Sequence, residues 1–271
     1  MKRIAVVAPS CRLSAAAAER VQAVVASRGD CELVIHPQCF LSDGHFAGAD
    51  EHRLAAFREV AADPGVDAIW LARGGYGSNR IAEAAVAGLP PTARDKLVMG
   101  YSDGGFLLAA LHRAGVEVAH GPMPADVLRE DGEAAVGRAL DWLVRRDPAA
   151  LEPGLAEPAF AFNLTVLSHL LGTPLEPDFT GAELLIEEVS EHHYRIDRLM
   201  FHVTADRNVR QAAQIRLGRA SDIPANDVDF GRDEEAIVAD WCARSGIRFG
   251  GRADIGHDAA NKVVPFGRRR T

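Results

Sequence analysis

Short apolar runs alternate with longer amphipathic stretches through the first half of the chain. The apolar runs have the length of buried strands, and they predict strands at residues 4–8, 32–36, 68–72 and 97–100. The stretches between them carry the features of helices, and they predict helices at residues 15–26, at residues 50–62 and up to residue 87. Strands separated by helices are typical of a mostly parallel sheet that is covered on both faces.

A proline-rich segment at residues 147–158 follows this half of the chain. It holds three prolines and a glycine in twelve residues, which is typical of a linker. We therefore expect an N-terminal domain over residues 1–150 and a C-terminal domain over residues 161–271. In the second half, the pattern predicts strands at residues 182–186, 213–217 and 247–251 and helices at residues 163–171, 194–203 and 233–245.

Composition and charge exclude several classes of protein. The 271 residues include 30 Lys and Arg against 38 Asp and Glu, a net charge of −8, so the chain is a poor candidate for binding nucleic acid. No apolar run approaches the roughly 18–20 residues of a membrane helix. The first apolar run is short and ends at Pro9, so it predicts a buried strand and not a signal peptide. The four cysteines form no Cys-x-x-Cys pair or zinc-ligand spacing, which predicts free thiols and a cytoplasmic location.

The most informative segment is the Gly-x-Ser-x-Gly sequence at residues 100–104, between a predicted strand and an apolar helix. A serine on such a tight turn projects its hydroxyl away from the backbone, and the helix N-terminus faces any developing oxyanion. Ser102 is therefore a candidate nucleophile. The alternative is that Ser102 only caps the helix and that the glycines serve only the turn.

A glycine-rich loop at residues 72–80 follows another predicted strand, so it lies at the same edge of the sheet. Its glycines allow backbone N–H groups to approach a ligand closely. The spacing matches neither dinucleotide-binding nor Lys-containing phosphate loops, which weakens a nucleotide interpretation. The loop can instead supply an oxyanion donor beside Ser102, or it can be a simple tight turn.

A nucleophilic serine needs a base, and the base needs an orienting acid. Among the ten histidines, His120 and His257 follow predicted strands on loops from which they can reach a distant serine, whereas the others near helices are expected at the surface or in packing. Glu187 and Glu188 end an apolar strand, and alternation along that strand allows at most one of them to face the site. Either glutamate can instead be solvated at the strand end.

Seven segments that follow one another along nearly the whole chain carry a more specific signal. They are residues 49–53 with 72–80, 100–103, 120–123, 163–164 with 171–174, 185–191, 194–198 and 255–257. In this order they resemble the LD-carboxypeptidases, a family of cytoplasmic serine peptidases that act on peptidoglycan peptides. The resemblance implies an N-terminal α/β sandwich with a parallel sheet and a smaller β-rich C-terminal domain.

The same resemblance implies the site. It assigns a catalytic triad to Ser102, Glu187 and His257, assembled across the domain interface, and an oxyanion hole to the backbone N–H groups of Gly75 and Asp103. It implies no metal and no organic cofactor. We also consider Arg73, Tyr76 and His120 as substrate contacts. The expected partner is a small peptide or muropeptide, with no nucleic acid and no membrane, and a homodimer is left open.

Three segments depart from the family pattern: residues 104–105, 161–162 and 201–206. They leave the triad intact but bear on the substrate, which is expected to be a peptide cleaved before a terminal D-alanine.

Two alternatives to this function remain. One is a relative of the microcin-immunity peptidases that cleaves aminoacyl or peptidyl sulfamoyl-adenylates, although Trp70, Trp142 and Trp241 all lie in buried patterns and aromatic residues make up only 6% of the chain. The other is a non-catalytic module that binds an anion with the loop at residues 73–80.

Overall fold

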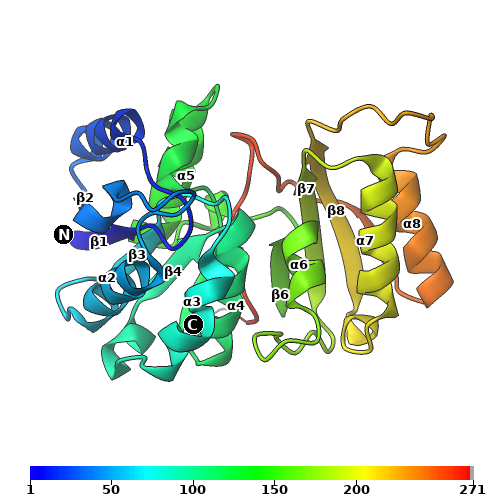
Figure 1. The fold of residues 1–271 in the computed structure, drawn as a ribbon, viewed down its shortest axis with the longest axis horizontal. Coiled ribbons are helices and arrows are strands. Elements are labelled where there is room, and N and C mark those ends of the chain that lie inside the picture. Colours follow the sequence, from blue (N-terminus) through cyan, green and yellow to red (C-terminus); the bar gives the residue numbers. More distant parts are fainter. Residues whose placement is uncertain (269–271) are drawn as a thin grey trace.

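The first half of the chain folds as a parallel sheet between two layers of helices (Figure 1). The computed structural model describes residues 1–268. Over that range the sheet has the order β10-β5-β4-β3-β1-β2, in which β10 alone is antiparallel to its neighbour. Its strands are β1 (Lys2–Val7), β2 (Cys31–Ile35), β3 (Ala68–Leu71), β4 (Leu97–Gly100), β5 (Glu117–His120) and β10 (Val264–Pro265).

Alternation along the strands explains the two helical layers. In β1, Ile4 and Val6 belong to a core formed with helices α1 (Ala15–Arg28) and α5 (Gly132–Arg145). Ala5 and Val7 point to the opposite face and belong to a core formed with the three remaining helices of this half, α2 (Asp50–Ala62), α3 (Ser78–Ala87) and α4 (Gly105–Arg113). Since β1 to β5 run parallel, their carboxyl ends lie at one edge of the sheet, where the glycine-rich loops follow β3 and β4.

The second half holds another parallel sheet, with the order β6-β7-β8-β9. Its strands are β6 (Ala159–Asn163), β7 (Glu183–Val189), β8 (Gln214–Ser221) and β9 (Phe249–Arg252), and its helices are α6 (Leu164–Leu170), α7 (His193–Ala205) and α8 (Glu234–Ser245). Leu184 and Ile186 of β7 pack in one core with residues of these helices, while Leu185 faces a smaller cluster on the other side of the sheet. The expected β-rich domain is thus a parallel sheet with a helical layer.

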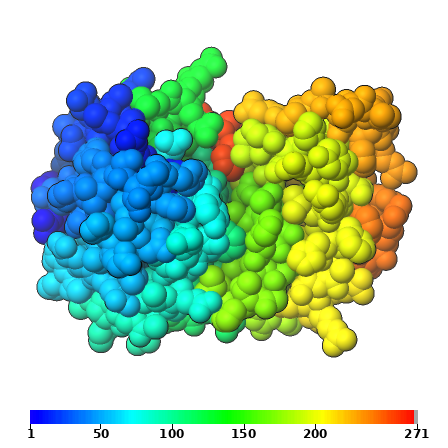
Figure 2. Space-filling view, viewed as in Figure 1, coloured from blue at the N-terminus to red at the C-terminus, as the bar shows by residue number. Residues whose placement is uncertain are grey.

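The chain end ties the two sheets together. Val264 pairs with His120 of the first sheet, and Gly267 forms an isolated bridge with Ala159 at the start of the second. In Figure 2, red atoms from near the end of the chain are visible between the two halves of the molecule. The predicted domains, residues 1–150 and 161–271, differ from the observed sheets at two points. The second sheet begins with β6 at Ala159, and β10 returns to the first sheet. Residues 269–271 of the predicted second domain lie outside the described residues.

Two of the departures from the family pattern pack against each other at the domain interface. A Cβ built on Gly105 of α4 would lie 3.2 Å from Cδ1 of Phe162 on β6 and 3.1 Å from Cγ1 of Val166 on α6. The large side chain at residue 162 therefore uses the space that glycine leaves at residue 105. The pair is a packing feature of the interface, and it changes no polar group of the site.

Most predicted elements are found with ends shifted by a few residues, and α2 and β4 have the predicted bounds. The pattern did not predict β6 and β10. Among the helices of residues 1–268, none is long and apolar enough to cross a membrane.

The predicted linker is anchored to the second domain by a buried carboxylate. Glu152 is only 3% exposed, and its two oxygens accept hydrogen bonds from Arg216 Nη2 at 2.7 Å and from the backbone N–H of Asp254 at 2.8 Å. The segment between the domains is therefore held in place at this residue.

Replacing Glu152 with alanine should lower the stability of the protein, because it leaves the guanidinium of Arg216 in a largely buried position without this partner. We expect a loss of about 3 kcal/mol, at the lower end of the range for breaking a buried ion pair, since Glu183 lies 3.5 Å from the same guanidinium. Thermal denaturation followed by circular dichroism measures the change. Glu133→Ala, which removes an exposed ion pair with Arg20, is the matched control and should cost less than about 1 kcal/mol.

Candidate active site

Ser102 occupies a strained turn between β4 and α4. Its φ angle of +57° lies in the left-handed region, which is uncommon for a residue with a side chain and is found where the fold demands it. A short 3-10 helix, Ser102–Gly104, leads from the strand into α4. A Cβ on Gly74 would lie 2.8 Å from both Cβ and Oγ of Ser102, so this position of the neighbouring loop requires glycine. The serine is thus held with its hydroxyl close to a second backbone segment.

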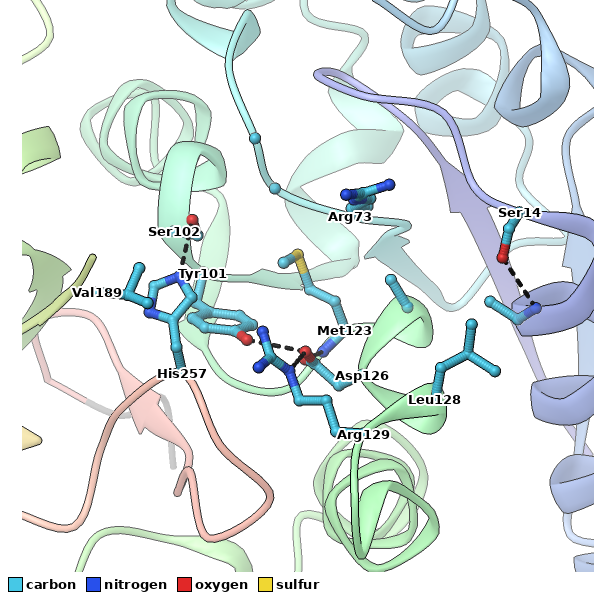
Figure 3. A pocket seen from close by; sticks show the side chains of 14 residues that line it. Ser14, Arg73, Tyr101, Ser102, Met123, Asp126, Leu128, Arg129, Val189 and His257 are labelled. Atoms are coloured by element: carbon cyan, nitrogen blue, oxygen red, sulfur yellow. Dashed lines mark hydrogen bonds and ion pairs between the residues drawn. The ribbon is translucent and has the colours of Figure 1, made fainter. Parts of the chain in front are cut away.

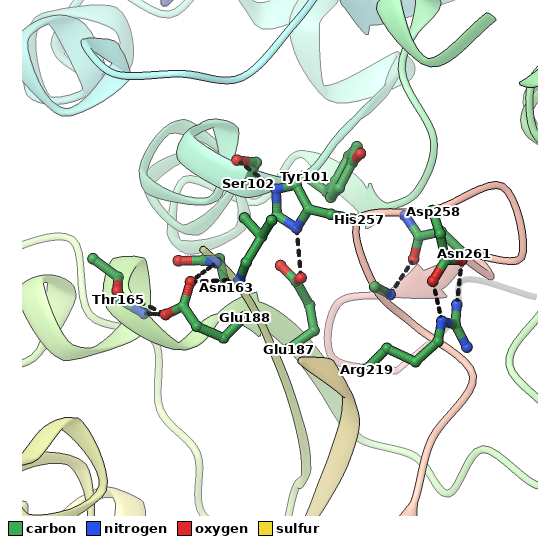
Figure 4. Close-up of polar contacts among 12 residues, drawn as sticks. Tyr101, Ser102, Asn163, Thr165, Glu187, Glu188, Arg219, His257, Asp258 and Asn261 are labelled. Carbon is green, nitrogen blue, oxygen red and sulfur yellow. Dashed lines mark hydrogen bonds and ion pairs between the residues drawn. The ribbon is translucent and has the colours of Figure 1, made fainter. Parts of the chain in front are cut away.

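The structure brings Ser102, His257 and Glu187 into one hydrogen-bonded row (Figure 4). With the ring proton on Nδ1, His257 donates to Oε2 of Glu187 at 2.6 Å and accepts from the Ser102 hydroxyl at Nε2, where the Oγ–Nε2 distance is 3.1 Å. Glu187 comes from β7, His257 from the loop after β9, and Ser102 from the first domain. The row therefore crosses the interface between the domains.

Burial strengthens the coupling between His257 and Glu187. The Glu187 side chain is fully buried, and its Oε1 has no hydrogen-bond partner within residues 1–268. Burial by itself lowers the pKa of His257, but the charge of Glu187 and its hydrogen bond act in the opposite direction and prevail, so the pKa of His257 is raised above its ordinary value. An imidazole in this position accepts a proton more readily than a free histidine does.

Glu188 points to the other side of the strand, as the alternation predicts. Its carboxylate accepts hydrogen bonds from Asn163 Nδ2 at 2.7 Å, from the Thr165 hydroxyl at 2.7 Å, and from the backbone N–H groups of Thr165 and Val189. Burial raises the pKa of Glu188. The alternative of a solvated strand end is wrong for both glutamates, because Glu187 and Glu188 are 0% and 3% exposed.

His120 lies behind the site, so its expected role as a substrate contact is not supported. The side chain is 1% exposed, its Nε2 is 3.0 Å from Oδ1 of Asn261, and its ring packs edge-on against Tyr101. Asn261 Oδ1 also accepts the backbone N–H of Gly256, next to His257. His120 thus helps to hold the loop that carries His257, and burial lowers the pKa of its own imidazole.

The two predicted oxyanion donors lie on segments that are firmly attached to each other. Gly75 has a φ of +107°, and a Cβ there would lie 2.4 Å from Cys11 Sγ. The Asp103 carboxylate accepts hydrogen bonds from the Ser10 hydroxyl and from the backbone N–H of Ser78 at 2.8 Å. The glycine-rich loop and the turn at Ser102 are therefore joined through a buried side chain.

Two cavities meet at Ser102. The first, of about 510 Å³, is lined by Arg73, Tyr101, Arg129 and His257 among others (Figure 3). The second, of about 450 Å³, is lined by Tyr76, Asn163, Glu188 and Glu191 among others. Ser102, Gly75 and Val189 border both. The predicted substrate contacts Arg73 and Tyr76 thus lie on opposite sides of the serine.

Three residues of the first cavity did not stand out in the sequence. Tyr101 packs its ring 4.9 Å from the ring of His257 and donates its hydroxyl to Asp126 Oδ1 at 2.9 Å. Asp126 also accepts from Nε of Arg129 at 2.9 Å. Burial, together with the charge of Asp126, raises the pKa of Tyr101 well above its ordinary value. The position of Tyr101 directly before the serine was the one available signal.

Other candidate chemistry is sparse in the described part of the chain. The four cysteines are buried and form no disulfide, and Cys11 Sγ lies 3.2 Å from Nε2 of His45. No group of three or more His, Cys, Asp or Glu side chains within residues 1–268 is arranged to hold a metal ion.

Comparison with known protein families assigns the chain. The model of the LD-carboxypeptidase N-terminal domain matches residues 4–121, and that of the LD-carboxypeptidase C-terminal domain matches residues 159–271. The chain belongs to the LD-carboxypeptidase family. It is therefore a member of a peptidase family, as the seven segments predicted.

Individual LD-carboxypeptidase relatives agree with this assignment. The "Murein tetrapeptide carboxypeptidase" of Pseudomonas aeruginosa is 28% identical, over 83% of this chain and 78% of the relative. The "Probable murein peptide carboxypeptidase" of Bacillus subtilis is 30% identical, over 83% and 74%. The crystal structure of muramoyltetrapeptide carboxypeptidase from Oxalobacter formigenes has a TM-score of 0.82 at 25% identity, covering 98% of this chain and 93% of that one.

The fold is also that of the microcin C7 self immunity protein MccF. Its structure in complex with glutamyl sulfamoyl guanosine has a TM-score of 0.81 and covers 98% of this chain and 91% of that one, at 18% sequence identity. At this identity the likeness concerns the fold.

Replacing Glu187 with glutamine should lower the pKa of His257, because it removes the negative charge that stabilises the imidazolium form. In the unchanged protein, His257 should titrate above about 6.5, the ordinary value for histidine. Titration of the imidazole signals by nuclear magnetic resonance measures both values. Glu188→Gln is the matched control, since that carboxylate lies on the other side of the strand, and an unchanged His257 pKa in Glu187→Gln would contradict the coupling.

Proposed function

We propose that this chain is a serine carboxypeptidase that hydrolyses the amide bond before a terminal D-alanine in peptides derived from peptidoglycan. The main support is the hydrogen-bonded row of Ser102, His257 and Glu187, which has the donor and acceptor order that a nucleophile, base and orienting acid require. Membership of the LD-carboxypeptidase family supports the choice of bond.

The chemistry follows from this row. Ser102 Oγ attacks the amide carbonyl while its proton passes to Nε2 of His257, and the backbone N–H groups of Gly75 and Asp103 stabilise the oxyanion. The C–N bond then breaks, and His257 returns the proton to the leaving amine. Water attacks the acyl-serine ester and gives a proton to His257, which passes it to the departing Ser102 Oγ as the acid is released. Glu187 holds the ring in the required tautomer and stabilises the imidazolium.

The relatives named for murein peptides support peptidoglycan fragments as the substrate class. The proposal includes a cytoplasmic location and a small peptide or muropeptide as the substrate, and it leaves a homodimer open. Ser102 is reached from two cavities of moderate size, which suits a short peptide.

Hydrolysis of sulfamoyl-adenylates is less well supported. That substrate calls for an aromatic platform, yet Trp70 and Trp142 are buried and the half-buried Trp241 donates its Nε1 proton to Asp197. None of these three tryptophans lines either cavity at Ser102, and the aromatic side chains there are Tyr101 in the first and Tyr76 and Phe106 in the second.

Ser102→Ala should abolish hydrolysis of a muropeptide tetrapeptide that ends in D-alanine. We expect a fall of roughly 10⁴-fold or more in kcat, as for other triad serines, with little change in melting temperature. Mass spectrometry of the released peptide and D-alanine gives the rate. EDTA should leave the rate of the unchanged protein intact, because the hydroxyl is activated by an imidazole. Retention of most activity in Ser102→Ala would exclude this serine as the nucleophile, and absence of turnover in the unchanged protein would favour a non-catalytic anion-binding module.

The pH dependence of kcat/KM should report the protonation of His257. The base must be neutral, so activity should fall as the pH drops through the pKa of His257, which Glu187 raises above about 6.5. A pH–rate profile on the same tetrapeptide measures this limb. His257→Ala should remove the activity, whereas His120→Ala should only reduce it because His120 acts on the position of the loop. A His257→Ala enzyme that keeps the acid limb would contradict this assignment.

A further inference from the structure

The two cavities at Ser102 are chemically different, and only one of them contains the base. The ring of His257 lines the first cavity together with Arg73 and Arg129, whereas the second cavity is lined by Glu188 and Glu191 and not by His257. This difference gives the site a direction. The leaving amine must receive its proton from His257, so the leaving amino acid should lie on the side where the imidazole is exposed.

Arg129 is oriented for a ligand in that cavity. Its Nε donates to Asp126 Oδ1 at 2.9 Å, and its guanidinium also interacts with the Tyr101 hydroxyl, while no carboxylate other than Asp126 pairs with it within residues 1–268. Asp126 is itself 5% exposed and also accepts from the Tyr101 hydroxyl and from the backbone N–H of Met123 at 2.8 Å. The guanidinium is therefore held by Asp126 and Tyr101 in the wall of the cavity (Figure 3).

Arg73 lies on another wall of the same cavity (Figure 3). Its side chain is exposed and has no ion pair or hydrogen bond in the part of the chain that the structure describes. It directly precedes Gly74 and Gly75, so its backbone is held close to Ser102. Two guanidinium groups, that of Arg73 without a partner within residues 1–268 and that of Arg129 paired with Asp126, thus border the space beside the base.

We propose that Arg73 and Arg129 bind the terminal carboxylate of the leaving amino acid and so restrict the enzyme to the last peptide bond; this inference rests on the proposed function. In a terminal amino acid the carboxylate is attached to the same Cα that carries the leaving nitrogen. A guanidinium matches a carboxylate through two parallel N–H···O bonds. The acyl part of the peptide then extends into the second cavity.

The same arrangement connects carboxylate binding to the base. Asp126 joins Arg129 to Tyr101, and the Tyr101 ring lies against His257. Asp126 and Tyr101 therefore position Arg129, which would hold the substrate carboxylate. Tyr101 also packs against the ring of His257. A peptide extended beyond this residue would place a neutral amide, and not a carboxylate, between the two arginines.

The test compares one tetrapeptide in two forms, with a free D-alanine carboxylate and with a D-alaninamide end. The unchanged enzyme should prefer the free acid, and Arg129→Gln or Arg73→Gln should each reduce the ratio of the two kcat/KM values by about 10- to 100-fold, the range for a lost charged hydrogen bond. Arg129→Lys should recover part of the preference. The control is Arg207→Gln, which removes an equal charge from an exposed site on the second domain and should leave the ratio unchanged.

The outcomes separate this inference from the proposed function. Hydrolysis of both peptides at similar rates by the unchanged enzyme, or an equal loss on both in the arginine variants, would overturn the carboxylate site while leaving the peptidase intact. If the unchanged enzyme cleaves neither peptide, the proposed function fails. Calorimetric binding of the acid and amide peptides to Ser102→Ala protein then decides the carboxylate site, which requires tighter binding of the acid. Since Arg73 forms no hydrogen bond or ion pair within residues 1–268, its variant tests the inference even if Arg129→Gln unfolds.

Discussion

A buried carboxylate that needs a cationic or hydrogen-bonding partner is the constraint on which this site depends. Glu187 is fully buried, and its compensation comes from His257, whose other nitrogen reaches Ser102 in the first domain. A buried charge without a partner is costly, so the position of the His257 loop is coupled to the stability of the second domain. The chemistry therefore requires that the two domains keep one fixed relation.

Several contacts maintain that relation, and none of them is itself part of the row. Glu152 anchors the segment between the domains, β10 adds residues of the chain end to the first sheet, and Phe162 fills the space beside Gly105. The loop of His257 is held from both sides, by Arg138 of α5 on its backbone and by Arg219 of β8 on Asp258. The departures at residues 104–105 and 161–162 are thus features of the interface, and they leave both cavities bordered by polar groups.

The two cavities differ in charge, so they distinguish the two sides of Ser102, which the hydrogen-bonded row of Ser102, His257 and Glu187 does not do by itself. One side of Ser102 combines the imidazole with two guanidinium groups and the Asp126 carboxylate that is paired with Arg129, and the other presents the carboxylates of Glu188 and Glu191. In an electrostatic sense the first side favours an anion and the second does not. A peptide with a charged end is therefore oriented before any bond is broken.

Much of the framework is determined by the sequence itself. Local patterns predict α2, β4 and the turn at Ser102, because periodicity and glycine placement act over a few residues, and alternation alone separates Glu187 from Glu188. They fail for β6 and β10, since one is directly followed by a helix and the other is two residues long. The resemblance to the family also selected His257 over His120 as the base. The enclosure of both glutamates and the meeting of Tyr101, Asp126 and Arg129 come only from the tertiary structure. Contacts between Ser102 and His257, 155 residues apart, depend on how two domains pack, and no local pattern encodes that packing.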